Sequence, residues 1–193
     1  MRRYQLAPFV QHIKRYQITE ATLVNPIVLN LLALPENEQG LLQSLRFAWV
    51  AGSPLDASVQ NRLSARLHQD AIISQVWGMT EMGWATAFLY PEKDTTGSVG
   101  RLLPNIEAKV VDESLQEINK EGERGEVLIR SPSIMTSYFK NTDATSSAIL
   151  DGGWLQTGDI GMCSISFNPI SCRRPECSRL ALDGSAPCLL HCS

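Results

Sequence analysis

Three short segments of the chain bring together residue types that can bind a nucleotide and a metal ion. The first, Ala51-Gly52-Ser53-Pro54-Leu55, has the composition of a turn whose backbone amides can approach a flat or anionic ligand. The alternative is a plain tight turn that leads from a strand into a helix. The sequence of this segment alone leaves both interpretations open.

The second segment places an aromatic ring, a hydroxyl and a carboxylate within five residues, Trp77-Gly78-Met79-Thr80-Glu81. It follows a predicted buried strand, where open α/β sheets bind their ligands. Trp77 can stack on a purine, Thr80 can donate to a phosphate, and Glu81 can hold Mg²⁺, a hard ion that prefers oxygen ligands. The alternative is a core tryptophan and a solvated glutamate.

The third segment runs from Asp151 to Gly161 and contains Gly158-Asp159-Ile160. Asp151-Gly152-Gly153 is typical of a hairpin turn. Asp159 lies in a tight glycine loop, where its carboxylate can accept from two vicinal hydroxyls. An aspartate that caps a helix or closes a turn is the alternative.

Alternating helix and strand patterns surround the first two segments and predict a parallel α/β layer over residues 1–95. Ser53, Pro54 and Asp56 suit a helix start, with Ser53 as its cap. The predicted helices cover residues 8–16, 27–34 and 56–68, and the predicted strands cover residues 19–24, 45–50 and 71–76. Residues 96–161 have shorter strand patterns at 106–111, 125–130 and 154–158, which indicate a small, mostly β subdomain.

Residues 162–193 show no stable period and predict an irregular tail. All five cysteines of the chain fall here, at Cys163, Cys172, Cys177, Cys188 and Cys192. A zinc or disulfide module is one interpretation, but the spacings do not match the usual zinc pairs. The favoured interpretation is that the tail is not an evolved continuation, as after a frameshift, a retained intron or a truncated gene model.

Taken together, five segments resemble the adenylate-forming (AMP-binding) superfamily, which includes acyl-CoA ligases and 4-coumarate-CoA ligase-like enzymes. The resemblance rests on the order of the motifs as well as on their letters. The motifs are Ala51-Gly52-Ser53-Pro54-Leu55, Val76-Trp77-Gly78-Met79-Thr80-Glu81, Thr96-Gly97-Ser98-Val99-Gly100-Arg101, Arg124-Gly125-Glu126-Val127-Leu128-Ile129-Arg130 with Ser137-Tyr138-Phe139-Lys140-Asn141, and Gly152-Gly153-Trp154-Leu155-Gln156-Thr157-Gly158-Asp159-Ile160-Gly161. It implies a partial large domain, made of a parallel α/β layer followed by a small β subdomain.

The resemblance also implies roles for individual residues. Thr80 would contact a phosphate and Glu81 would hold Mg²⁺, both as catalytic residues, while Asp159 would bind the ribose hydroxyls. The other implied ATP or AMP contacts are Trp77 stacked on adenine, Gly52, Ser53 and Pro54 on its other side, and Gly78 and Met79. The residues implied to border the acyl pocket are Gly78, Met79, Gly97, Ser98, Val99 and Gly100.

The implied reaction activates a carboxylic acid with ATP and transfers the acyl group to a thiol, with ATP, Mg²⁺ and CoA as cofactors. The family's phosphate loop and its C-terminal lysine have no counterpart in the sequence, so we expect the isolated chain to be an inactive fragment. The alternative function is a non-catalytic remnant that keeps adenine-nucleotide binding or an interaction role. Neither the acid nor the choice between CoA and a carrier-protein thiol can be deduced from the sequence.

The composition and net charge of the chain argue against nucleic acid and membrane as its partners. The chain has 193 residues, 44% of them hydrophobic, and a formal net charge of −3, which gives no electrostatic footprint for nucleic acid. No apolar run has the length of a transmembrane helix. We therefore expect small-molecule partners, namely a carboxylic acid and an adenine nucleotide. The family resemblance implies a cytoplasmic or peroxisomal location.

Overall fold

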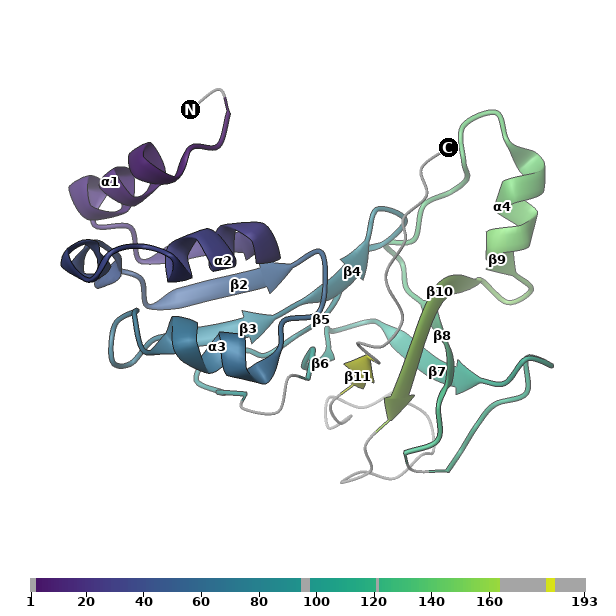
Figure 1. The fold of residues 1–193 in the computed structure, drawn as a ribbon. Helices are drawn as coiled ribbons and strands as arrows, with labels where there is room; N and C mark the ends of the chain where they lie inside the picture. Colours follow the sequence, from purple (N-terminus) through teal and green to yellow (C-terminus); the bar gives the residue numbers. More distant parts are fainter. Residues whose placement is uncertain (1–2, 95–97, 121, 164–179, 183–193) are drawn as a thin grey trace. The chain divides into compact units, whose positions relative to one another are not determined.

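The chain folds into two compact units that are interleaved in sequence. A computed structural model describes residues 3–94, 98–120, 122–163 and 180–182 (Figure 1). Of these described residues, those up to 76 and those from 88 to 94 form the first unit, and those from 77 to 87 and from 98 onward form the second. Each unit has a hydrophobic core of its own. The predicted division of the chain at residues 95 and 161 stays a prediction.

A three-stranded parallel sheet in the order β1-β2-β3 forms the centre of the first unit. Glu20 pairs with Phe47, which pairs in turn with Ile72. The strands are β1 (Glu20–Val24), β2 (Phe47–Ala51) and β3 (Ile72–Gln75). The helices are α1 (Leu6–Tyr16), α2 (Asn25–Leu32), the 3₁₀ helix η1 (Glu36–Leu42) and α3 (Ala57–Ser64). The predicted parallel α/β layer is confirmed. Its three strands pair in parallel, and helices alternate with them along the chain.

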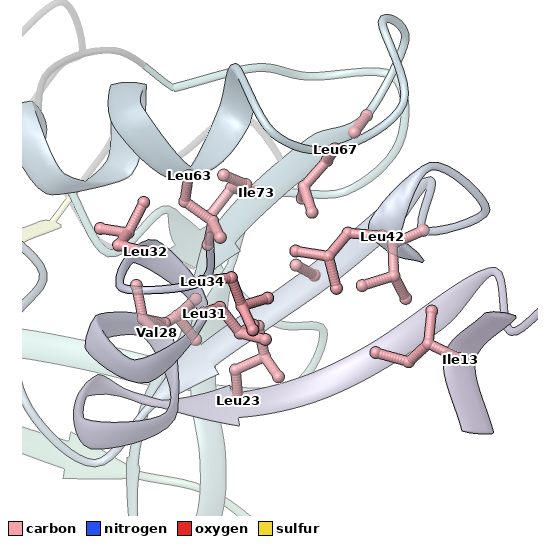
Figure 2. Packing of buried hydrophobic residues seen from close by; sticks show 14 of the residues in the cluster. Ile13, Leu23, Val28, Leu31, Leu32, Leu34, Leu42, Leu63, Leu67 and Ile73 are labelled. Carbon is pink, nitrogen blue, oxygen red and sulfur yellow. The ribbon is translucent and has the colours of Figure 1, made fainter. Parts of the chain in front are cut away.

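The core of the first unit lies where α1, α2 and α3 pack against the sheet (Figure 2). Ile13 of α1, Leu31 of α2 and Leu63 of α3 point into it together with Leu23 of β1. All four side chains are buried, and the apolar spacing of the helices places them on one face. This packing fixes the end of β2, which is followed by the first candidate loop.

The start of α3 differs from the prediction. Asp56, not Ser53, is the N-cap, and its Oδ1 accepts from the Ser58 N–H at 2.8 Å. Ser53 instead uses its Oγ as an acceptor for Asn25 Nδ2, at 2.7 Å. The hydrogen bonds from Ser58 lower the pKa of Asp56, because they favour the charged carboxylate.

The second unit contains two antiparallel sheets. The smaller is β4-β5-β6, in which the β4–β5 hairpin carries the second candidate segment (Figure 1). Its strands are β4 (Trp77–Met79), β5 (Gly83–Ala87) and β6 (Arg101–Leu102). The larger sheet has the order β11-β10-β8-β7, with β9 paired to β10. Its strands are β7 (Glu107–Val111), β8 (Gly125–Arg130), β9 (Ile149–Leu150), β10 (Trp154–Cys163) and β11 (Leu180–Leu182).

The core of the second unit is built by both sheets. Trp77 of the hairpin, Val127 and Ile129 of β8, and Leu155 of β10 are all buried in it. A short helix, α4 (Thr142–Ala148), follows β8 and is capped by Asn141. The predicted strands at 106–111, 125–130 and 154–158 correspond to β7, β8 and the first half of β10.

Strand β10 extends beyond its predicted end to Cys163 and pairs there with β11. Most of the predicted tail, with Cys172, Cys177, Cys188 and Cys192, lies outside the described residues. Within the part that the structure describes, no helix combines the length and the apolar character needed to cross a membrane.

Candidate functional site

The β4–β5 hairpin holds Thr80 and Glu81 at its turn. The Met82 N–H donates to the Met79 carbonyl at 3.1 Å, and this bond closes the turn. Gly78 is required for the hairpin, because a Cβ at this position would lie 2.2 Å from the Gly83 carbonyl oxygen. Thr80 is exposed and Glu81 is half-buried. The hairpin therefore presents a hydroxyl and a carboxylate side by side.

The Glu81 side chain has a fixed partner rather than a shell of solvent alone. Tyr138, which is 57 positions later in the chain, donates from its hydroxyl to Glu81 Oε1 at 2.9 Å. This hydrogen bond, together with burial, raises the pKa of Tyr138. Within the described ranges the other carboxylate oxygen, Oε2, accepts no hydrogen bond. One oxygen of Glu81 is thus held in place, and the other has no hydrogen-bond partner among the described residues.

Trp77 links the hairpin to the third candidate segment. Its indole Nε1–H donates to Asp159 Oδ2 at 2.6 Å, across 82 positions of sequence. The ring is buried, with 6% of its surface exposed, and packs among the core residues of the second unit. The structure therefore shows Trp77 as a core residue that also donates to a carboxylate, and its stacking on adenine stays a prediction.

Asp159 lies on a bulge in β10. Gln156 pairs with Leu128 and Ile160 pairs with Glu126, so three residues of β10 oppose one residue of β8. Gly158, in the middle of the bulge, has a φ of +70°, a conformation that side chains with a Cβ rarely adopt. The bulge turns Asp159 out of the ladder, as bulges near functional sites often do.

The bulge is held by hydrogen bonds to β8. Thr157 Oγ1 donates to the Val127 carbonyl at 2.7 Å and accepts from the Asp159 N–H at 3.1 Å. Glu126 Oε1 accepts from the Gly158 N–H at 3.0 Å. As with Glu81, one carboxylate oxygen of Asp159 is bonded to an aromatic donor, and no described residue bonds to Oδ1.

The first candidate loop belongs to the first unit and is fixed there at both ends. Asn25 Nδ2 donates to Ser53 Oγ and to the Pro54 carbonyl, both at 2.7 Å. Gln75, which is 3% exposed, accepts from the Leu55 N–H at 2.7 Å and donates to its carbonyl at 3.0 Å. The loop that carries Gly52, Ser53 and Pro54 is therefore rigidly connected to β3. Its proposed contact with adenine stays a prediction.

The residues predicted to border an acyl pocket are described only in part. Gly97 lies outside the described residues. Val99 is buried in the core of the second unit, against which Met79 is half-buried. Ser98 is buried and its Oγ accepts from the Gly100 N–H at 3.2 Å. The role of these residues toward an acyl group stays a prediction.

Two residues that bond to the candidate segments could not be identified from the sequence, namely Tyr138 and Glu126. Both lie in motifs that carried the family resemblance, but their partners are 57 and 32 positions away. No local pattern connects them to those partners. Among the described residues, no three His, Cys, Asp or Glu side chains form a metal-binding cluster.

Comparison with known proteins identifies the relatives of the chain. It is 38% identical over 164 residues to the acyl-CoA synthetase ACTT5 of Alternaria alternata, which covers 84% of this chain and 28% of that protein. It is 41% identical over 167 residues to the acyl-CoA ligase azaF of Aspergillus niger, covering 84% and 31%. The chain thus spans less than a third of these relatives.

Solved structures of related enzymes superimpose on the chain. The amide bond synthetase McbA of Marinactinospora thermotolerans superimposes with a TM-score of 0.78 at 27% identity, covering 95% of this chain and 35% of that one. ATP-bound MatB of Rhodopseudomonas palustris superimposes with a TM-score of 0.77 over 94% of this chain and 33% of its own, at 22% identity, and this match shows the fold alone. The family model described as AMP-binding enzyme matches residues 1–139. The chain belongs to the family of AMP-binding enzymes.

Proposed function

We propose that the protein containing this chain is an acid–thiol ligase of the acyl-CoA synthetase type. In the first half-reaction a carboxylate oxygen of the acid attacks the α-phosphorus of ATP, which forms an acyl-adenylate and releases pyrophosphate. In the second half-reaction a thiol, that of CoA, attacks the acyl carbon, which forms a thioester and releases AMP. The acyl-CoA ligases among the relatives, 37–41% identical over more than four fifths of the chain, support this reaction class.

The observation that carries the proposal is the matched arrangement of two carboxylates. Glu81 and Asp159 each have one oxygen fixed by an aromatic donor of the same unit, Tyr138 or Trp77. The second oxygen of each has no hydrogen-bond partner among the described residues. A carboxylate restrained in this way is preorganised to accept a ligand without first losing a protein contact.

The chemistry of these groups fits a nucleotide with its metal. We propose that Asp159 Oδ1 accepts from a ribose hydroxyl and that Thr80, exposed on the turn, donates to a phosphate oxygen. Glu81 Oε2 is an oxygen ligand suited to Mg²⁺, which neutralises phosphate charge when it is bound. The residues of this chain thereby hold the nucleotide in position, and positioning contributes a large share of the rate in phosphoryl and adenylyl transfer.

An acid-dependent exchange of pyrophosphate into ATP tests the first half-reaction. The full-length protein is incubated with ATP, Mg²⁺, labelled pyrophosphate and a panel of fatty, aryl and amino acids, and then with CoA. We expect exchange with at least one acid class and a thioester plus AMP after CoA is added. Nucleotide binding without exchange for any acid would support a non-catalytic remnant instead. The expectation that the 193 residues alone are inactive stays a prediction, and the same assay on that polypeptide tests it.

A further inference from the structure

Tyr138 lies in the segment between β8 and α4, next to the hairpin turn that carries Glu81. Three hydrogen bonds join this segment to the hairpin turn. The Met135 N–H donates to the Glu81 carbonyl at 2.7 Å, Ser133 Oγ donates to the Met82 carbonyl at 2.9 Å, and the Tyr138 hydroxyl donates to Glu81 Oε1. Two of these bonds hold the backbone of the turn, and only the third reaches the carboxylate.

The Tyr138 backbone is itself restrained by the first turn of α4. The Tyr138 N–H donates to Thr145 Oγ1 at 3.0 Å. The Thr145 hydroxyl in turn donates to the Asn141 carbonyl at 2.7 Å. Asn141 is the N-cap of α4, with its Oδ1 accepting from the Ala144 N–H. The phenol hydroxyl is therefore presented to Glu81 from a backbone that the helix start holds in one place.

We propose that Tyr138 is a positioning residue for Glu81: its hydroxyl fixes Oε1, so that Oε2 binds the divalent cation that accompanies ATP. This inference rests on the proposed function. A carboxylate that ligates a metal commonly has a hydrogen-bond donor on its other oxygen, which sets its orientation. The half-buried position of both groups makes the bond hard for water to replace.

The test separates metal binding from nucleotide binding. The full-length protein and its Tyr138→Phe variant are titrated with Mg²⁺ at fixed ATP, and with AMP in the absence of metal. We expect Tyr138→Phe to raise the Mg²⁺ concentration needed for half-maximal ATP binding by about tenfold or more. AMP affinity should change less than about twofold, because Asp159 and its contacts are untouched.

Ser133→Ala is the matched control, since it removes a hydrogen bond between the same segment and the same turn without reaching the carboxylate. It should leave the Mg²⁺ requirement unchanged. Thr145→Val is a second variant, which keeps the phenol but removes the acceptor for the Tyr138 N–H. It should raise the Mg²⁺ requirement in the same direction, by less than Tyr138→Phe.

The outcomes distinguish this inference from the proposed function. If the unsubstituted protein shows no acid-dependent exchange of pyrophosphate into ATP, the proposed function fails and the inference fails with it. If it exchanges but binds ATP with no dependence on Mg²⁺, the inference alone is overturned. If Mg²⁺ dependence is present but is unchanged in Tyr138→Phe and Thr145→Val, or is shifted equally by Ser133→Ala, the inference alone is overturned. If Tyr138→Phe does not fold, as shown by lost AMP binding, Thr145→Val decides between these two results.

Discussion

The hydrogen bond between Trp77 of the β4–β5 hairpin and Asp159 of the β10 bulge should stabilise the folded protein. Its contribution should appear as a coupling free energy between the two residues. Its Nε1···Oδ2 distance is 2.6 Å, and its acceptor is a carboxylate. Hydrogen bonds to charged groups contribute about 1.5–3 kcal/mol. Asp159 is half-buried, so solvent screening places the expected coupling at the lower end of that range, about 1.5–2 kcal/mol.

A double-mutant cycle measures this coupling without the cost of the lost ring volume. Trp77→Phe alone should cost about 2–4 kcal/mol, because it removes buried ring atoms as well as the donor. Asp159→Ala removes the acceptor, and the double variant removes both. The coupling is the difference between the double variant and the sum of the single variants.

Urea unfolding of the full-length protein, followed by far-ultraviolet circular dichroism, provides the four unfolding free energies. Trp49 and Glu20 form a control pair, since the Trp49 indole N–H also donates to a carboxylate but the contact is exposed. Its coupling should stay below about 0.5 kcal/mol. A Trp77–Asp159 coupling within about 0.3 kcal/mol of zero would refute the reasoning, because the bond would then connect the two elements without stabilising either.

Three further substitutions test the local geometry. Gly78→Ala should destabilise the protein by about 1–3 kcal/mol or more in urea unfolding, because its Cβ would overlap the Gly83 carbonyl oxygen. Glu126→Ala should weaken AMP binding by roughly 1–2 kcal/mol in calorimetric titration, because it removes the carboxylate that accepts from the Gly158 N–H and holds the bulge. Asp56→Ala should destabilise the protein at neutral pH, and the difference from wild type should vanish on acidification: the folded-state pKa of Asp56 is lowered, so its contribution is present above the unfolded pKa and is lost as the pH falls through the folded one.

Each of these predictions has a result that would contradict it. Gly40→Ala is the control for Gly78→Ala, since nothing beyond its chain neighbours lies within 4 Å of the added Cβ, and equal effects of the two would exclude the steric argument. Unchanged AMP affinity in Glu126→Ala would show that the bulge does not depend on that carboxylate. A destabilisation by Asp56→Ala that is constant across acidic and neutral pH would exclude the charged cap as its cause.

The first unit could be predicted well from the sequence, because its signals are local. Apolar residues in β1, β2 and β3 form short runs, and those of α1 and α3 recur on one helical face. The predicted N-cap of α3, Ser53, was wrong, because both Ser53 and Asp56 have side chains that can cap a helix and both precede it. Tertiary contact decided between them, since Asn25 occupies the Ser53 hydroxyl.

The hairpin was not predictable in the same way. Strand β4 has three residues, too few for a period, and its pairing with β5 depends on a glycine contact across the hairpin. The β10 bulge depends on Glu126 from another strand. The residue types of the candidate site could be deduced from the motifs, but the donors that orient Glu81 and Asp159 come from distant positions and required the fold.

Calorimetric titration of the full-length protein with AMP, without metal, tests the central claim most directly. AMP lacks the β- and γ-phosphates that bind the divalent ion, so its affinity reports on the contacts to adenine, ribose and the α-phosphate without the metal. We predict that the unsubstituted protein binds AMP and that Asp159→Ala loses at least about tenfold in affinity, the value expected for a lost hydrogen bond to a carboxylate. An Asp159→Ala variant that folds and binds AMP as tightly as the unsubstituted protein would contradict the account.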